Sequence, residues 1–184
     1  KRVAERGSAA GMEVRLAAYG EVGERWQVDA WVSVEMIEAV GRRYRPDYFH
    51  DIARDLAPGG RVAIQAITMP HERMLASRDT FTWIHKYVFP GGLIPSTRAI
   101  EETVRDHTRL RLARRDAFGA HYAETLRLWR ERVTPPAHDG EALDFDETLP
   151  RPRALFLGLS PAGVPGGHLP VQQYLCTAEK PPPT

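Results

Sequence analysis

The chain has 184 residues, of which 42% are hydrophobic and 27% are charged, and its formal net charge is +1. This length and composition are those of a folded domain with its own core. The near-neutral charge excludes a general nucleic-acid-binding protein, whose phosphate contacts need a marked basic excess. Arginine clusters at 109–115 and 127–132 are either solvated faces of regular elements or contacts for an acidic surface such as phospholipid headgroups.

Cysteine, histidine and apolar content limit the kinds of site. Cys176 is the single cysteine, which excludes an intrachain disulfide and a cysteine-based zinc site and favours a reducing cytoplasm. His71, His85 and His121 lack the spacing of metal ligands, so we predict no metal site. No apolar stretch reaches the roughly 20 residues of a membrane-spanning helix. The segment 1–11 has no signal-peptide core and no initiator methionine, so we expect a fragment of a longer protein.

The first part of the chain predicts alternating strands and helices. Residues 13–18 alternate apolar and polar side chains like a half-buried strand, and residues 29–34 are typical of a central, fully buried parallel strand. Pro46 suits the first turn of a following helix, and the turn at 58–60 ends that helix. The apolar stripe of this helix is Tyr48, Phe49, Ile52 and Leu56. Residues 61–67 predict the next strand. This alternation indicates an α/β sheet with a right-handed crossover.

The later part of the chain predicts a helix, a strand and a second helix. Ser96 is expected to cap a helix that runs to about Arg105. Residues 110–117 alternate and predict an edge or antiparallel strand. Four apolar residues then fall on one helix face: Tyr122, Leu126, Trp129 and Val133.

The remaining residues differ in composition. Residues 149–170 contain five prolines and four glycines without a helical pattern. We therefore divide the chain into a folded domain at 1–133 and an irregular tail at 134–184, which we expect to be poorly ordered or loosely docked.

Candidate site residues follow the predicted strands. In an open α/β sheet, ligands bind beyond the carboxyl ends of the strands. Val34 ends one strand and precedes Glu35 and Glu38, while Gln65 lies near the end of the next. Glu38 is either a carboxylate that stabilises or accepts positive charge, or a residue favoured at a helix N-terminus by the dipole. Tyr122 is either a hydrogen-bond donor at the same crevice or a packing residue.

The segment 83–95 has an unusual composition. It combines three aromatic residues, a His-Lys pair and two prolines around Gly91-Gly92. Neither a regular helix nor a regular strand accounts for that mixture, because proline fixes φ and glycine permits positive φ. The segment is either a substrate-binding loop or a surface loop whose aromatic side chains fill a gap in a neighbouring core.

Four segments of the chain form an ordered set of motifs: Val32–Gly41, Gln65–His71, Trp83–Gly92 and Phe118–Leu126. They resemble, in the same order, motifs of the cyclopropane-fatty-acyl-phospholipid synthase and mycolic acid cyclopropane synthase family. The resemblance runs from residue 1 to about 148. It implies an α/β fold, namely a partial Rossmann-like class I methyltransferase domain that contains the C-terminal half of the sheet and lacks the N-terminal strands.

The resemblance also implies a reaction. Family members use S-adenosylmethionine to methylate the cis double bond of unsaturated acyl chains, usually on phospholipids, and a bound bicarbonate ion removes a proton from the resulting cation. The product is a cyclopropane ring or, in a subgroup that Gln65 resembles, a methylene- or methyl-branched chain. The resemblance implies a peripheral enzyme at the cytoplasmic face of the inner membrane, with unsaturated phospholipid acyl chains as its partners.

Site residues carry over from the family by matching positions. The resemblance implies that Glu38, Tyr122 and Gln65 are catalytic, and that the same three residues and Val34 bind bicarbonate. It also implies that Tyr19, Val34 and Glu35 bind the methyl donor. The residues implied to bind the substrate are Trp83, Tyr87, Phe89, Pro90, Gly91 and Gly92.

Departures from the family pattern limit what this chain does alone. It lacks the family's glycine-rich donor loop, its acidic ribose-binding residue and its active-site cysteine. We therefore expect the isolated chain to be inactive, to bind the donor weakly and to be marginally stable or self-associating. Residues 149–170 replace a helix that should be rich in aromatics and alanine, so we hypothesise a compensated frameshift there. Two alternatives stay open: a methyltransferase for another small molecule, and an inactive lipid-binding fragment.

Overall fold

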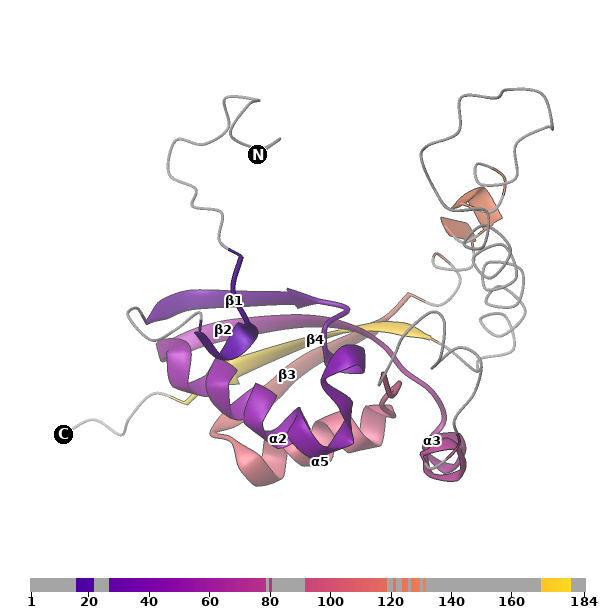
Figure 1. Ribbon diagram of the computed structural model, residues 1–184. Helices are drawn as coiled ribbons and strands as arrows, with labels where there is room; N and C mark the ends of the chain where they lie inside the picture. The colour runs from indigo at the N-terminus through magenta and orange to yellow at the C-terminus, as the bar shows by residue number, and fades with distance from the viewer. Residues whose placement is uncertain are drawn as a thin grey trace.

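The computed structural model describes residues 16–21, 27–78, 80, 92–118, 121, 124–125, 127–129, 131 and 170–179. Its elements are η1 (Tyr19–Glu21), β1 (Val28–Val34), α2 (Ile37–Asp55), β2 (Leu56–Ile67), α3 (His71–Ser77), α5 (Thr97–His107), β3 (Leu110–Ala117) and β4 (Val171–Ala178). Four strands form one sheet in the order β1-β2-β4-β3 (Figure 1). β1 and β2 are parallel, whereas β4 runs antiparallel to both of its neighbours.

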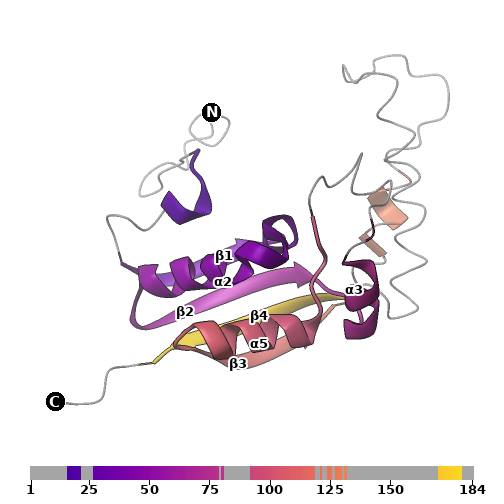
Figure 2. The ribbon, with the colours of Figure 1, turned by 60° about the horizontal axis from the view of Figure 1, so that its bottom comes forward.

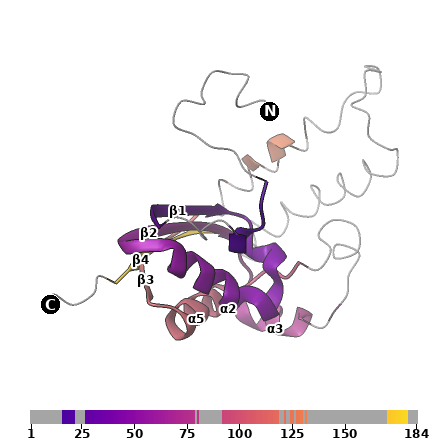
Figure 3. The ribbon, with the colours of Figure 1, turned by 60° about the vertical axis from the view of Figure 1, so that its left-hand side comes forward.

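Helices α2 and α5 lie against the same face of the sheet (Figures 2 and 3). Between them and the sheet is the core, which buries apolar side chains of α2, β2, α5 and β4. Its most enclosed members include Tyr48, Phe49, Ile52, Val62, Ile64, Ile100 and Tyr174. Alternate residues of β2 are buried, as expected for a strand with one covered face.

The unit β1–α2–β2 confirms the predicted crossover. Strand β1 matches the prediction at 29–34, but it is not fully buried: Val32 and Val34 are 71% and 57% exposed. The reason is that Val32 and Val34 flank Ser33, which contacts Tyr48 of α2, so the two valines lie on the face of the sheet opposite α2 and α5. The strand predicted at 13–18 is wrong for residues 16–18, which are irregular and lead into η1; residues 13–15 lie outside the described part.

Helix α2 is longer than predicted and is interrupted at Gly41, whose φ of 73° and ψ of 170° are not helical. A positive φ of this kind favours glycine. The helix ends at Asp55, and the turn at 58–60 lies inside β2. There the pairing shifts from Val28↔Leu56 to Ala30↔Arg61, so the intervening residues bulge out of the strand.

Two further predictions are confirmed. Helix α5 starts after Ser96, whose Oγ accepts a hydrogen bond of 3.1 Å from the Ala99 amide. Strand β3 occupies residues 110–117 as an antiparallel edge strand.

The prediction of an irregular tail at 134–184 is wrong for residues 171–178, which form β4 in the interior of the sheet. Strand β4 pairs along its length with β2 on one side and β3 on the other, which fixes it firmly. The irregular character predicted for 134–184 therefore fails at 171–178. The division of the chain at 133/134 stays a prediction, and residues 149–169, where the frameshift was hypothesised, lie outside the described part.

Candidate active site at the ends of β1 and β2

The parallel strands β1 and β2 end side by side, which brings the predicted strand-end residues together. Val34 pairs with Gln65, and the Glu35 amide donates to the Gln65 carbonyl at 2.9 Å. Glu35 has a φ of 52°, a left-handed conformation that is uncommon for a residue with a side chain. Such strain persists only where the surroundings hold it, and it is frequent at functional sites.

Glu38 lies in the short helical segment before Gly41 and reaches the end of β2. Its Oε1 accepts a hydrogen bond of 2.5 Å from the Ile67 amide, while its Oε2 is enclosed and has no partner among the described residues. Burial raises the pKa of the Glu38 carboxyl above its ordinary value, and hydrogen bonds from backbone amides oppose that rise. A half-buried carboxylate with one free oxygen is suited to accept a proton or to stabilise positive charge.

Below Glu38, Ser33 and Tyr48 form a buried pair, with 2.5 Å between Oγ and the phenolic oxygen. Burial is the main cause that raises the pKa of Tyr48 to about 12, and the charge of Glu38 adds to it. Tyr48 is therefore a neutral hydroxyl that links β1 to α2. The sequence pattern placed Tyr48 only in an apolar stripe, because spacing does not show which aromatic carries a hydrogen-bonded hydroxyl.

Gln65 is held by hydrogen bonds at both ends of its amide. Its Nε2 donates to Oε1 of Glu35 at 3.0 Å, and its Oε1 accepts from Nε2 of Gln173 at 3.0 Å. Gln65 alternates with the core residues Ile64 and Ala66, so its side chain lies on the opposite face of the sheet from α2. Gln173 in β4 is a contact that the sequence analysis missed, since 108 positions separate the two glutamines.

A buried polar network connects β4 to β2 and α5. Nε2 of Gln172 donates to the hydroxyls of Thr68 and Thr97, at 2.8 Å each. The Tyr174 hydroxyl donates to Oγ1 of Thr97 and Oε1 of Gln172, both at 3.2 Å. These bonds hold the end of β2, and so the position of Ile67 beside Glu38.

The remaining predicted residues reach the site to different extents. Tyr19 packs edge-on against Tyr48, with ring centroids 5.2 Å apart. Its described contact with the site is therefore with the Tyr48 ring. Gly92 precedes Leu93, whose amide donates to the Glu38 carbonyl at 2.8 Å. The end of the predicted substrate loop therefore lies beside Glu38. The other predicted site residues lie outside the described part of the chain: Trp83, Tyr87, Phe89, Pro90, Gly91 and Tyr122.

The arginine clusters make ion pairs with acidic neighbours. Arg111 contacts Glu179, Arg114 contacts Asp116, and Arg115 contacts Glu101. Arg127 contacts Glu124 and Glu131. This pairing is what solvated faces of regular elements show, and it supplies no unbalanced basic patch for phospholipid headgroups at these arginines. None of the described helices is long and apolar enough to cross a bilayer.

Comparison with known families gives a match over almost the whole chain. The family model described as mycolic acid cyclopropane synthetase matches residues 1–173. The chain is 51% identical over 183 residues to "Tuberculostearic acid methyltransferase UfaA1" of Mycobacterium tuberculosis, a match that covers 99% of this chain. It is 32% identical over 132 residues to "Cyclopropane-fatty-acyl-phospholipid synthase" of Escherichia coli, which covers 72% of this chain. The chain spans only 42% and 32% of the lengths of these two relatives.

Solved structures show the same fold. The mycolic acid cyclopropane synthase CmaA1, solved with SAH and CTAB, matches with a TM-score of 0.77 and 24% identity, over 94% of this chain and 65% of that one. The cyclopropane synthase MmaA2 from Mycobacterium tuberculosis matches with a TM-score of 0.76 and 25% identity, over 94% and 64%. With the mixed four-stranded sheet, these likenesses confirm the predicted partial Rossmann-like methyltransferase fold.

Proposed function

The chain belongs to the mycolic acid cyclopropane synthetase family, and we propose from this premise that it carries part of the active site of a lipid-modifying methyltransferase. The proposed reaction transfers the methyl group of S-adenosylmethionine to the cis double bond of an unsaturated fatty acyl chain of a phospholipid. The alkene carbon forms a bond to the methyl carbon as the sulfonium bond breaks, which leaves S-adenosylhomocysteine and a carbocation on the acyl chain. Loss of a proton then gives the neutral product.

The observation that carries this proposal is the Glu38 carboxylate. It lies at the end of β2, where α/β enzymes bind ligands, and its Oε2 is enclosed without a donor. A negative charge held in a partly buried place stabilises a nearby cation more than it would in water. The end of the proposed substrate loop at Gly92 adjoins the same residue through Leu93.

Bicarbonate fits the free oxygen of Glu38, and we propose it as the bound base. Its hydroxyl is the kind of donor that the unpartnered Oε2 lacks. The chemistry that this ion supplies when bound is acceptance of the proton that the cationic product loses. Glu38 would orient it, and Gln65 and Tyr122 would complete the site; Gln65 is already fixed by Glu35 and Gln173.

For the product, the name of the relative with 51% identity, a methyltransferase, favours a branched chain over a ring, and loss of a proton from the cation gives the methylene-branched form. The direct test uses the longest gene product that contains this chain, incubated with oleoyl phospholipid and methyl-labelled S-adenosylmethionine. We expect label in the acyl chain, and mass and NMR analysis to distinguish a ring from a branch. Label transferred to a soluble amine or hydroxyl acceptor instead would establish the small-molecule alternative.

Glu38→Gln is the matching variant for that assay. Because it removes the charge but keeps an oxygen for the Ile67 amide, we expect turnover to fall about 100-fold or more with little change in folding. Glu72→Gln is the control, since Glu72 is an exposed carboxylate at the start of α3. Equal turnover of both variants and wild type would refute the role of Glu38. Binding to oleoyl phospholipid vesicles without any turnover in the wild type would favour the lipid-binding alternative.

For the 184-residue chain alone, we propose weak or absent donor binding. Of the residues assigned to the donor, Val34 and Glu35 meet at the strand end, while Tyr19 packs on Tyr48. The glycine-rich loop of the family is not in this sequence. Calorimetric titration with S-adenosylmethionine or S-adenosylhomocysteine tests this, and micromolar affinity would contradict it. We propose a cytoplasmic location at the inner membrane face, which fractionation of cells that express the protein would test.

A further inference from the structure

A cavity of about 380 Å³ lies between α2, α3 and α5, and Glu38 does not line it. Its volume is within the usual range of small-molecule sites. The charged side chains and imidazoles that line it are Arg42, Arg45, Arg78, His71, His107, Glu102 and Asp106. Leu93, which bonds to the Glu38 carbonyl, forms part of the wall, so the cavity adjoins the proposed active site.

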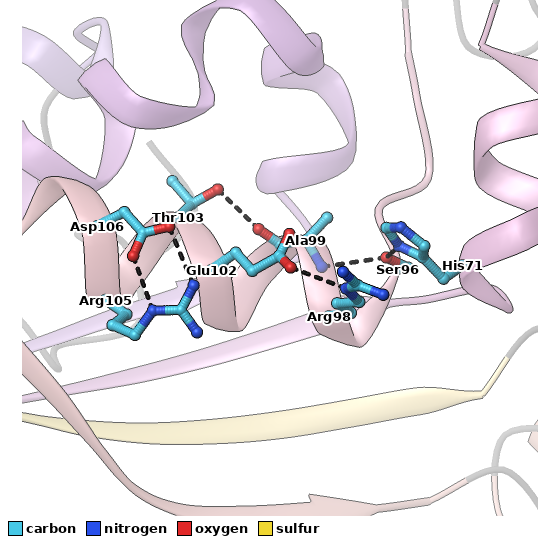
Figure 4. A network of polar contacts seen from close by, with 8 residues as sticks. All are labelled: His71, Ser96, Arg98, Ala99, Glu102, Thr103, Arg105 and Asp106. Atoms are coloured by element: carbon cyan, nitrogen blue, oxygen red, sulfur yellow. Dashed lines mark hydrogen bonds and ion pairs between the residues drawn. The ribbon is translucent and has the colours of Figure 1, made fainter.

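The two carboxylates of this cavity are already paired with arginines that do not line it. Glu102 accepts from Nε of Arg98 at 2.8 Å, and Asp106 accepts from Nε of Arg105 at 2.7 Å (Figure 4). Their charges are therefore largely balanced along α5 itself. Arg42 and Arg45 of α2 bring positive charge to the same cavity.

Arg45 is the unusual member of that lining. It is only 4% exposed, and its Nε and Nη2 are enclosed without a hydrogen-bond partner among the described residues. A buried guanidinium without an acceptor is strongly unfavourable, so such groups in proteins are normally paired. Burial, and next the charge of Arg42, lower the pKa of Arg45, which shows the same lack of a negative partner.

The backbone of α2 adds to the positive field. Because the helix is interrupted at Gly41, it restarts at residues 42–55, and Arg42 and Arg45 lie in the first turn of that segment with Pro46 beside them. The first amides of a helix have no intrahelical acceptor, and this end carries the positive end of the dipole. The two arginines that line the cavity thus belong to a helix start.

We propose that this cavity binds a phosphate group through Arg45 and Arg42. Guanidinium groups match phosphate oxygens in geometry and charge, and a helix start supplies further donors. Nε and Nη2 of Arg45 are enclosed, so phosphate reaches them only after a side chain moves. Either Arg45 changes its rotamer, or the exposed side chain of Arg42 moves aside. The phosphate is either free or the headgroup phosphate of a phospholipid. The inference goes beyond the proposed reaction, since binding here needs neither donor nor turnover.

The test is calorimetric titration of the 184-residue chain with inorganic phosphate at constant ionic strength. We expect saturable binding that weakens about tenfold or more in Arg45→Met and in Arg42→Gln, because each loses a charge-assisted hydrogen bond. Arg43→Met is the matched control: Arg43 is exposed on the same helix, lies over the Tyr44 ring and does not line the cavity. We expect this control to bind phosphate like the wild type.

Two results would overturn the proposal. One is no saturable phosphate binding by the folded wild type; the other is equal weakening in all three variants, which would show general attraction to the positive surface. Should Arg45→Met fail to fold, circular dichroism will show it, and the exposed Arg42→Gln still decides. Vesicles of phosphatidylglycerol then identify the source. Weaker vesicle binding by Arg45→Met than by Arg43→Met indicates a lipid headgroup, and equal vesicle binding indicates free phosphate.

Discussion

Glu38 keeps one carboxylate oxygen enclosed without a hydrogen-bond donor among the described residues. Its pKa is raised by burial above the ordinary 4.5, so the folded chain holds this proton more tightly than the unfolded chain does. Stability contributed by the protonated form is therefore present at low pH and is lost as pH rises from about 4.5 through the folded pKa. We expect Glu38→Gln to become more stable than wild type as the pH rises through this range, and to keep that difference at higher pH. Urea unfolding from pH 4.5 to 8 measures the free energy of unfolding of both proteins.

Glu35→Gln is the control for this pH series. It removes one negative charge at the same edge of the sheet from an exposed side chain and keeps an oxygen for the Gln65 amide. If Glu35→Gln followed the same curve as Glu38→Gln, then net charge rather than burial of Glu38 would set the pH dependence, and the prediction would be wrong.

The Ser33–Tyr48 pair allows a second prediction for single residues. Removing either hydroxyl leaves the other one buried without its partner, so Ser33→Ala and Tyr48→Phe should each lower the free energy of unfolding by about 1–3 kcal/mol. The double variant should lose less than the sum of the two, because it leaves no orphaned group. Chemical denaturation of all four proteins gives the coupling energy, and simple additivity would contradict the pair.

Sequence reasoning at this scale succeeded where a residue's place follows from its element. Glu35 and Gln65 meet because each is near the carboxyl end of a parallel strand. It gave no role to Arg45, because burial of a guanidinium depends on how α3 and α5 pack against α2. It failed for Gln173 because that contact depends on which strands become neighbours.

Helix α5 shows how one side chain defines the start of an element. Ser96 is 1% exposed, caps the Ala99 amide and also contacts Nδ1 of His71 at 2.7 Å (Figure 4). Ser96→Ala removes both contacts, and we expect the free energy of unfolding to fall by about 1–2 kcal/mol. Ser77→Ala is the control, because the Ser77 hydroxyl caps no helix start. An effect of Ser96→Ala no larger than that of the control would contradict the capping role.

Local pattern predicted α5 and β3 well, because a cap and an alternation specify them. It predicted β2 only over residues 61–67, since the strand starts at Leu56 and contains the turn that was expected to end the preceding helix. The interruption of α2 at Gly41 was not predicted, since a single glycine does not reveal whether its φ is positive. Strand β4 was also missed. Its apolar residues follow a stretch rich in proline and glycine, and its stability comes from partners far away in sequence.

For the whole molecule, β4 is the element that joins the two halves of the sheet. It contributes Val171, Tyr174 and Cys176 to the buried interior and pairs with both β2 and β3. A chain ending at residue 169 should therefore lose cooperative unfolding, because β2 and β3 would have no common neighbour. Circular dichroism during urea titration tests this.

A chain ending at Glu179 is the control for that truncation. It retains all of β4 and the contact between Glu179 and Arg111. We expect its unfolding midpoint to equal that of the 184-residue chain. A sharp, native-like transition in the chain ending at 169 would show that β4 is dispensable.

The late position of β4 in the chain bears on how the protein is made. Translation delivers β1, β2 and β3 from the ribosome well before β4, at about 5–20 residues per second. During that interval β2 and β3 each present an unsatisfied backbone edge, which a nascent chain on a neighbouring ribosome is able to pair with. Chaperones that bind emerging polypeptides should therefore matter more for the yield of this protein than for one whose central strand is synthesised first.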